Sequence, residues 1–465
     1  MTDTTFSVSG QRVLVVGAAR SGVAAARLLA KRGAVVTLTD AKHHIPQDAE
    51  LRSAGIILEL GAHWARTFKS SDLIVMSPGV PLDMPEVLLA KAAGVPVIGE
   101  LELASRWLRG PIVAITGTKG KSTTTTLVGR MLEASGRKVL VGGNIGYPLS
   151  AQVEASTPDT VHVVEASSFQ LETTDTFRPW IAALLNFSPD HLDRHPDEAA
   201  YAAAKIRIFA NQQPCDWAVV NADSPEAMRM SEQARSQVVR YAIENTANAE
   251  VLVDRGFVWQ RTSEGDIPLL PLAAVHLAGR HMLSNVAAAT AISHLAGATG
   301  DSLARALEGF TGLEHVMEPV GSKGGVRFIN DSKATNVDAA ARSIESFDKV
   351  VAIVGGRFKG GDFADLAGPL RAHGRAVIAI GEARPLVRHA LAGVVPVEEA
   401  ETLADAVRRA WDLAVPDGVV LLAPACSSFD MFEDYADRGR RFKEEVRRLL
   451  TEGLPPAARR ANGEQ

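Results

Sequence analysis

The sequence predicts an α/β protein with three domains. Short apolar runs rich in Val and Ile alternate with segments of helix-like spacing along most of the chain. Glycine-rich or polar turns follow several of these runs, which is where parallel sheets place their ligands. The chain has 465 residues, and because domains commonly hold roughly 100–200 residues, three is the expected number.

Two breaks divide this alternating pattern. Pro111 stands just before one apolar run, and residues 309–312 carry two glycines and have the character of a linker. The predicted domains are therefore residues 1–110, 111–313 and 314–465. With 46% hydrophobic and 22% charged residues, each domain can bury an ordinary core.

Composition and charge narrow the functional class. The formal net charge is −5 and no long basic run occurs, which argues against a nucleic-acid surface. The two cysteines, Cys215 and Cys426, are too few for a disulfide framework or a cysteine-rich metal site. The N-terminus does not resemble a signal peptide, and no run approaches the roughly 18 apolar residues of a membrane span. We expect a cytoplasmic protein with neither nucleic-acid nor membrane partners.

The first domain opens with a Rossmann-like strand, turn and helix. The apolar run 13–16 leads into a glycine-containing turn at 17–22. A second strand ends at Asp40, near the distance at which a dinucleotide fold places its ribose-binding acid. Ala19 replaces the glycine that lets a pyrophosphate approach closely. A nicotinamide cofactor is therefore less expected than a nucleotide of another kind.

A third strand of this domain ends in a second candidate ligand position. Ser77, Pro78 and Gly79 follow the apolar run 73–76. Such residues at a strand end either contact a ligand or form a plain Pro-Gly turn. The pattern alone leaves both interpretations open.

The central domain begins with a phosphate-binding loop. An apolar, β-branched run at 112–115 ends at a turn containing Gly117 and Gly120, and Lys121 opens a stretch of helical spacing. The glycines let backbone N–H groups turn towards an anion, and the helix adds its positive N-terminal end. Lys121 can reach the β- and γ-phosphates of a nucleotide, and the Ser122 hydroxyl can hold Mg²⁺. The strict P-loop pattern is not met, so we interpret the loop as a shortened variant.

Four further polar residues in this domain admit both a functional and a structural interpretation. Glu165 ends the apolar run 161–164, where an ATP site needs a Mg²⁺ ligand, but a strand-terminal Glu is often a solvated edge residue. Asp190 and His191 follow another strand and either serve a second cation or belong to a polar loop that caps the following helix. Lys205 lies in an amphipathic helix, where a lone lysine is usually a snorkelling surface residue.

The last domain repeats the α/β alternation. Its apolar strands are predicted at 326–329, 350–354, 377–380 and 419–423. Polar groups follow three of them, at 330–336, 355–359 and 427–428. Because parallel strands end at the same edge of a sheet, these groups predict one ligand-binding edge.

Taken in order over nearly the whole chain, these motifs resemble the ATP-dependent Mur ligases of peptidoglycan synthesis. The resemblance rests on residues 117–123, Asn144, 165–171, 190–193, Lys205, His281 with Asn285, and 330–336. It implies a P-loop-type central ATPase domain between Rossmann-like N- and C-terminal domains. In this family a substrate carboxylate attacks the γ-phosphate of ATP, and an amine then attacks the resulting acyl phosphate. The N-terminal domain and residues 330–336 resemble the members that add glutamate to UDP-N-acetylmuramoyl-L-alanine.

The same resemblance implies roles for individual residues around ATP and Mg²⁺. ATP would be bound by Gly117, Thr118, Lys119, Gly120, Lys121, Ser122, Thr123, Asn285 and Asp331. The catalytic residues would be Lys121, Glu165, His191 and Lys205. The cation ligands would be Ser122, Glu165, His191 and Lys205, the last as a carbamate. This implied role replaces the interpretation of Lys205 as a surface residue.

The other two substrates would have sites of their own. The UDP-sugar would contact Ser21, Asp40, Ser77, Gly79 and Asn144. Glutamate, whose handedness the sequence does not choose, would contact Lys333, Thr335, Lys359, Ser428 and Tyr435. The expected enzyme is a monomer. It departs from the family at Val316, where these ligases carry an arginine that reaches ATP phosphate.

Sister ligases of the same family, a nucleotide-dependent dehydrogenase and a non-catalytic nucleotide sensor are the alternative functions. Turnover of NAD(P)H would indicate the dehydrogenase. ATP hydrolysis that depends on a UDP-sugar would exclude the sensor.

Overall fold

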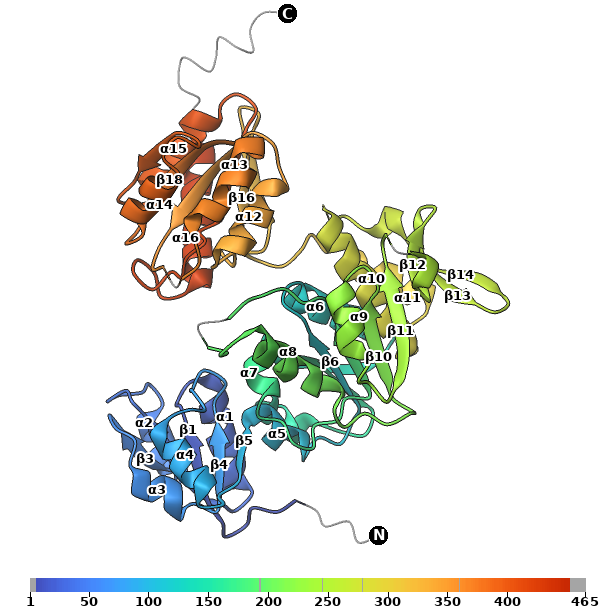
Figure 1. Cartoon of the computed structure of the whole chain (residues 1–465), viewed down its shortest axis with the longest axis vertical. Coiled ribbons are helices and arrows are strands. Elements are labelled where there is room, and N and C mark those ends of the chain that lie inside the picture. The colour runs from blue at the N-terminus through green and yellow to red at the C-terminus, as the bar shows by residue number, and fades with distance from the viewer. Residues whose placement is uncertain (1–5, 192–193, 245, 278, 359, 452–465) are drawn as a thin grey trace, which may run out of the picture. The chain divides into compact units, whose positions relative to one another are not determined.

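The computed structural model describes residues 6–191, 194–244, 246–277, 279–358 and 360–451. The chain divides into two compact units, Met1–Phe310 and Thr311–Gln465. The first unit holds a five-stranded and a nine-stranded sheet, and the second holds a six-stranded sheet (Figure 1). Helices cover all three sheets, so the predicted α/β class is confirmed. Each sheet lies within one of the three predicted ranges, whose boundaries near 110 and 313 remain predictions.

The first sheet is parallel, with strand order β3-β2-β1-β4-β5. Its strands are β1 (Arg12–Val16), β2 (Val35–Asp40), β3 (Ile57–Leu60), β4 (Leu73–Met76) and β5 (Val97–Gly99). Its helices are α1 (Arg20–Lys31), α2 (Asp48–Ser53), α3 (Ala65–Ser70), α4 (Pro85–Ala92) and α5 (Glu100–Ser105). Helices α1, α2 and α5 pack on one face and α3 and α4 on the other. The order reverses at β1, so the turns after β1 and β4 share one ligand-binding crevice.

The second sheet has the order β14-β13-β12-β11-β10-β9-β6-β8-β7. The strands that carry the site are β6 (Ile112–Thr116), β7 (Lys138–Gly143), β8 (Thr160–Glu165), β9 (Ile181–Leu184) and β10 (Trp217–Asn221), all parallel. The helices are α6 (Lys121–Ala134), α7 (Ser168–Leu171), α8 (Glu198–Ile206), α9 (Pro225–Ser231), α10 (Arg280–Leu295) and α11 (Gly300–Leu307). Short 3-10 turns are η1 (Leu149–Ala151), η2 (Val153–Ala155), η3 (Arg207–Phe209), η4 (Thr246–Asn248) and η5 (Leu272–Ala274). Because β8, β6 and β9 are neighbours, their C-terminal loops meet.

The far edge of this sheet changes direction. Strand β11 (Gln237–Ala242) pairs in parallel with β12 (Val251–Asp254). Strand β13 (Phe257–Thr262) then pairs antiparallel with β12 on one side and with β14 (Gly265–Pro271) on the other.

The third sheet has the order β15-β16-β20-β17-β18-β19 and is parallel except for β15. Its strands are β15 (Glu318–Lys323), β16 (Val326–Asn330), β17 (Val350–Gly355), β18 (Gly374–Ile380), β19 (Val397–Glu399) and β20 (Val419–Leu422). Its helices are α12 (Val337–Glu345), η6 (Phe363–Leu366), α13 (Ala367–His373), α14 (Arg384–Ala390), α15 (Leu403–Ala414) and α16 (Tyr435–Thr451). Helices α12 to α14 cover one face and α15 and α16 the other. The four predicted strands are confirmed as β16, β17, β18 and β20.

A buried histidine in β8 makes the stability of the central domain sensitive to acid. The His162 side chain is fully buried, and its Nε2 lies 2.7 Å from Ser156 Oγ. Burial, with a smaller contribution from Lys138, lowers the pKa of His162 to about 4. In the unfolded chain a histidine titrates near pH 6.5, so below that pH the unfolded state binds a proton that the native state lacks. The free energy of unfolding is therefore expected to fall by about 3 kcal/mol between pH 6.5 and pH 4 through this group.

His162→Gln tests this expectation. Urea unfolding of both proteins between pH 4 and pH 7 should show a shallower loss of stability on acidification in the variant. Identical slopes would contradict a buried neutral His162.

Candidate functional site

The loop between β6 and α6 forms the predicted phosphate cradle. Gly117 and Gly120 have φ angles of +153° and +81°, which residues with a Cβ atom rarely adopt. A Cβ on Gly120 would also lie 2.2 Å from Asn285 Oδ1. The conformation of the loop therefore needs glycine at 120, and Asn285 of α10 occupies the space next to it. Helix α6 begins at Lys121, so its first-turn N–H groups lie at the end of the loop.

Two lysine side chains converge on this loop. Lys121 Nζ donates to the carbonyl oxygens of Gly117 and Thr118, each at 2.9 Å. Lys205 Nζ, from the last turn of α8, also donates to Gly117 O at 2.9 Å. Lys205 is 1% exposed, so the interpretation of Lys205 as a snorkelling surface residue is wrong. Helix α8 turns this side chain into the domain instead of towards water.

The electrostatics of Lys205 follow from this position. Burial lowers its pKa well below the ordinary value, the neighbouring Lys121 lowers it further, and Asp190 opposes the shift. A low dielectric disfavours the charged ammonium, and a second cation nearby does the same. Lys205 is thereby favoured as a neutral amine, which is the nucleophilic form.

Glu165 and Asn144 lie at the ends of adjacent strands β8 and β7. Asn144 Nδ2 donates to Glu165 Oε1 at 2.6 Å, and Asn144 N donates to Glu165 O at 2.9 Å. Glu165 is 1% exposed, and its second carboxylate oxygen, Oε2, is buried without a hydrogen-bond partner. A buried carboxylate oxygen with no donor is suited to a cation. The alternative of a solvated edge residue is therefore wrong for Glu165.

Aromatic rings surround the candidate second-cation residues. His191 has φ +57°, its Nε2 lies 3.9 Å from Asp190 Oδ2, and its ring packs against Phe169 at 5.0 Å. The His191 side chain is 45% exposed, so this imidazole is accessible to a ligand. Residues 192 and 193 of the predicted motif lie outside the described residues. Ser168 Oγ lies 3.0 Å from His195 Nε2, which gives that second histidine a structural partner.

Two residues of this site were missed in the sequence. Tyr201 OH lies 3.3 Å from Thr118 Oγ1, and burial raises the pKa of Tyr201 to about 12, so its hydroxyl keeps its proton at neutral pH. Asn186 follows β9 and contacts the phosphate loop through its amide. Their only sequence signals are a tyrosine four residues before Lys205 and an asparagine one residue beyond an apolar run.

The predicted UDP-sugar residues of the first sheet meet at one turn. Asp40 Oδ2 accepts a hydrogen bond from Ala18 N at 2.6 Å, and Ser77 Oγ donates to Gly17 O at 2.9 Å. Ser21 lies in the first turn of α1 and Gly79 faces open space. The structure thus brings the loops after β1, β2 and β4 together, as their strand ends predict.

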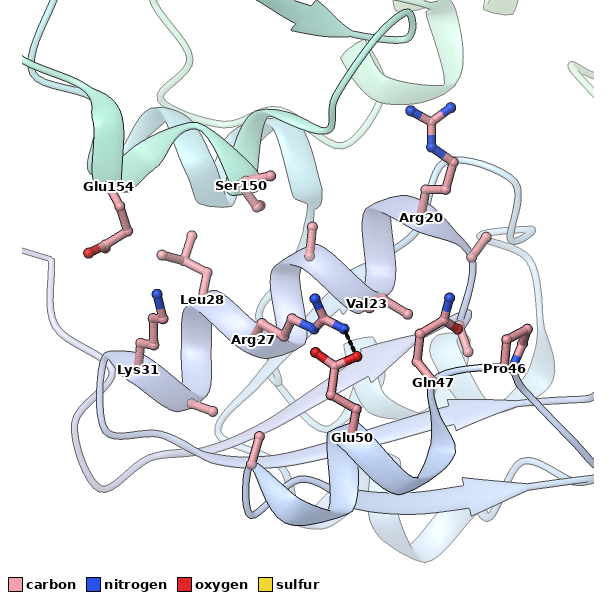
Figure 2. Close-up of a pocket in the computed structure, with 16 residues that line it drawn as sticks. Arg20, Val23, Arg27, Leu28, Lys31, Pro46, Gln47, Glu50, Ser150 and Glu154 are labelled. Carbon is pink, nitrogen blue, oxygen red and sulfur yellow. Dashed lines mark ion pairs between the residues drawn. The ribbon is translucent and has the colours of Figure 1, made fainter.

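A cavity of about 930 Å³ adjoins the same turn (Figure 2). It is lined by residues of α1 and α2 and by Ser150, Ala151 and Glu154 around η1 and η2. The Arg27–Glu50 ion pair, at 2.6 Å, lies within it. Ala18 to Arg20 line the cavity, whereas Asp40, Ser77 and Gly79 do not. The predicted UDP-sugar cluster and this cavity therefore share only the loop that begins α1.

In the second unit, the turn after β16 is held from two directions. Asp331 Oδ1 accepts from Met317 N at 3.2 Å, and Ser343 Oγ of α12 donates to Asp331 Oδ2. Lys333 N donates to His315 O at 3.1 Å. His315 and Met317 both have positive φ, +65° and +47°, so Val316 sits at the tip of a tight turn. Burial lowers the pKa of His315, which favours its neutral form.

A buried arginine joins the loops that carry the predicted glutamate residues, and it was missed in the sequence. Arg438 of α16 is fully buried and donates to Ser332 Oγ at 3.0 Å, to Ser332 O at 2.9 Å and to Cys426 O at 3.1 Å. Burial lowers its pKa to about 10, so it stays charged at neutral pH. It ties the loop containing Lys333 and Thr335 to the loop containing Ser428. Tyr435 opens α16 and is 39% exposed. Lys359 lies outside the described residues.

Among the described residues, no three His, Cys, Asp or Glu side chains come together as a ready-made metal cluster. A cation bound at Glu165 would therefore need further ligands from hydroxyl groups, water or a bound phosphate. No helix within the described ranges has the length and apolar character required to span a bilayer.

Family models match most of the chain. They are the Mur ligase MurD-like N-terminal domain at residues 11–99, the Mur ligase middle domain at 115–293 and the Mur ligase glutamate ligase domain at 317–426. A UDP-N-acetylmuramoylalanine–D-glutamate ligase of Koribacter versatilis is 44% identical over 96% of this chain and 99% of its own length. The protein of that name from Acidobacterium capsulatum is 45% identical over 95% and 97%.

Solved structures share the fold at low sequence identity. The UDP-N-acetylmuramate-alanine ligase MurC of Thermotoga maritima has a TM-score of 0.59 at 19% identity, covering 94% of this chain and 100% of its own. A pseudomurein peptide ligase type C of Methanothermus fervidus has a TM-score of 0.58 at 18% identity, with 95% and 100% coverage. At such identities the likeness is one of fold alone.

Proposed function

The chain belongs to the Mur ligase family, and we propose that it is the ATP-dependent ligase that joins D-glutamate to UDP-N-acetylmuramoyl-L-alanine in peptidoglycan precursor synthesis. Similarity at 44% identity to D-glutamate ligases over 96% of the chain is the observation that carries this function. The convergence of Lys121 and Lys205 on the phosphate loop supports ATP chemistry at that loop.

The reaction has two steps. An oxygen of the alanyl carboxylate attacks the γ-phosphorus of ATP, which releases ADP and leaves an acyl phosphate. The amine of glutamate then attacks the acyl carbon, loses a proton, and displaces inorganic phosphate. Both steps concentrate negative charge, so positioned cations and backbone N–H groups do most of the work. In our proposal, Lys121 and the first turn of α6 provide them.

Mg²⁺ fits the residues present. The Glu165 Oε2 atom is buried without a hydrogen-bond partner, and Ser122 is the second residue of α6, at the end of the phosphate loop. We propose that Glu165 and Ser122 hold the cation together with nucleotide phosphate, and that His191 serves a second one. Bound Mg²⁺ would neutralise phosphate charge and orient the γ-phosphate.

Lys205 fits a carbamate. In our proposal its neutral amine adds to CO₂, forming an N–C bond, and one proton leaves. The product is an anionic group beside the phosphate loop, and an anion can position a cation where an ammonium cannot. Burial and the proximity of Lys121 both favour the neutral amine that this addition requires.

We assign the remaining contacts from the roles that matching residues have in the Mur ligase family. Asp40, Ser77, Ser21, Gly79 and Asn144 would hold the UDP-sugar, and Asn285 and Asp331 the adenosine part of ATP. Lys333, Thr335, Ser428, Tyr435 and Lys359 would hold glutamate, since ammonium and hydroxyl groups suit a second carboxylate. The enzyme would act in the cytoplasm, because ATP and UDP-linked precursors are cytoplasmic substrates, and we propose that it acts as a monomer.

Phosphate release from MgATP in the presence of UDP-N-acetylmuramoyl-L-alanine tests the function. The panel contains D-glutamate, L-glutamate, D-aspartate and no amino acid. Release that requires D-glutamate is expected. Release with L-glutamate alone would keep the mechanism and change the substrate, and no release in any arm would contradict the proposed function.

A further inference from the structure

The phosphate loop is short, and an asparagine just beyond a neighbouring strand forms hydrogen bonds with its backbone. Only Thr118 and Lys119 lie between Gly117 and Gly120. Asn186 Oδ1 accepts from Thr118 N at 3.1 Å and from Lys119 N at 2.9 Å, and Asn186 Nδ2 donates to Lys119 O at 3.1 Å. The backbone oxygen of Asn186 also accepts from Thr118 N, at 3.2 Å. One side chain thus makes three hydrogen bonds to the backbone of two consecutive residues, Thr118 and Lys119.

These bonds decide which N–H groups face a nucleotide. In a P-loop of ordinary length, backbone N–H groups along the loop cradle the phosphates. Here the N–H groups of Thr118 and Lys119 are bound to Asn186. The cradle therefore depends on the turn at Gly120 and on the first turn of α6.

The loop is braced on other sides as well. Thr118 Oγ1 donates to Ser188 O at 3.0 Å and accepts from Ser188 N at 3.1 Å, so the strand-end segment that carries Asn186 is itself tied to the loop. Asn285 Oδ1 lies against Gly120 from α10. These contacts hold the loop in one conformation, which is the condition for binding a ligand without an ordering penalty.

We propose that Asn186 is a positioning residue for the nucleotide, fixing the shortened phosphate loop in the conformation that binds ATP phosphate. This inference rests on the proposed function of the loop as an ATP site. Asn186 reaches ATP through the loop backbone and does not enter the chemistry.

Two substitutions distinguish the loss of all three side-chain hydrogen bonds from the loss of the donated one alone. Asn186→Ala removes all three side-chain hydrogen bonds. Asn186→Asp is nearly isosteric and keeps the two acceptor contacts, but it places a carboxylate oxygen against Lys119 O and adds negative charge beside the loop proposed to bind phosphate. We expect the Kd for the Mg²⁺ complex of a non-hydrolysable ATP analogue to rise about tenfold or more in both variants. The KM for UDP-N-acetylmuramoyl-L-alanine should change less than about twofold.

Asn221→Ala is the matched control. Asn221 is another buried asparagine at the end of the adjacent strand β10, and its Nδ2 donates to Leu185 O at 3.0 Å, one residue before Asn186. The amide is removed from the same neighbourhood without touching the loop, so nucleotide affinity should stay near that of the wild type.

The outcomes distinguish this inference from the proposed function. Calorimetric titration measures the Kd for the nucleotide analogue, and this Kd depends on the loop whether or not the enzyme forms product. Wild-type nucleotide affinity in the folded Asn186→Asp protein, or an equal loss in Asn221→Ala, would overturn the role of Asn186. A wild-type enzyme that binds the analogue but makes no product with D-glutamate would instead contradict the ligase function.

Discussion

Lys205→Met is expected to lower kcat by about a thousandfold or more and, at the same time, to raise the melting temperature. The thioether cannot add CO₂, so the anionic group proposed to position a cation is lost, and losses of charge stabilisation at a transferring phosphoryl group are of this order. The methionine also removes a buried amine whose pKa is lowered by burial and by Lys121. Stability and activity therefore change in opposite directions, as expected for a group kept for function.

The pH dependence of stability gives a second measurement on the same variant. In CO₂-free buffer, the unfolded chain holds a proton on this lysine up to about pH 10.5, whereas the native protein releases it at lower pH. Between the lowered pKa of Lys205 in the native protein and its pKa in the unfolded chain, the free energy of unfolding of the wild type should rise with pH through this group. The variant should lack that rise.

Lys69→Met is the control, because Lys69 is an exposed lysine in α3. This substitution should leave both the activity and the pH dependence of the free energy of unfolding unchanged. A wild-type kcat in Lys205→Met would contradict the catalytic role.

Glu165→Gln is expected to lower kcat about a hundredfold or more and to raise the Mg²⁺ concentration needed for half-maximal activity at least tenfold. The amide keeps an oxygen that can accept from Asn144 Nδ2, so the local fold should survive. It removes the charge of the buried carboxylate whose Oε2 has no hydrogen-bond partner. Initial rates across a MgCl₂ titration measure both effects.

Glu133→Gln is the control for this substitution, because Glu133 is an exposed carboxylate on α6. Its Mg²⁺ dependence should match that of the wild type. If Glu165→Gln shows the same Mg²⁺ dependence as its control, Glu165 is not a cation ligand and its burial is structural.

Local patterns were enough to predict the parts of the fold that depend on neighbouring residues. The apolar run before Gly117 and the helical spacing after Lys121 are consecutive in the chain, and both appear as β6 and α6. The same holds for β16, β17, β18 and β20, each an apolar run bounded by a turn. Because strand ends of a parallel sheet meet at one edge, the clustering of Asp40 and Ser77 also followed from the pattern.

Features that depend on distant segments could not be predicted in this way. The burial of Lys205 results from the packing of α8 against the phosphate loop, which lies 88 residues earlier in the chain. Arg438 makes its contacts with Ser332 across 106 residues of sequence. Nothing in the sequence next to Arg438 distinguishes it from the other arginines of α16. The Asn186 contacts span 67 or 68 residues and depend on β9 lying beside β6. Amphipathic spacing reports which face of an element is apolar, and it does not report which polar group that face meets.

The transfer of ¹⁸O from substrate to phosphate tests the central claim most directly. UDP-N-acetylmuramoyl-L-alanine labelled in both carboxylate oxygens is incubated with MgATP, D-glutamate and the wild-type enzyme, and the inorganic phosphate is analysed by mass spectrometry. Activation through an acyl phosphate predicts one ¹⁸O in each phosphate released and one retained in the new amide. Phosphate that carries no ¹⁸O, formed together with the amide product, would contradict that mechanism.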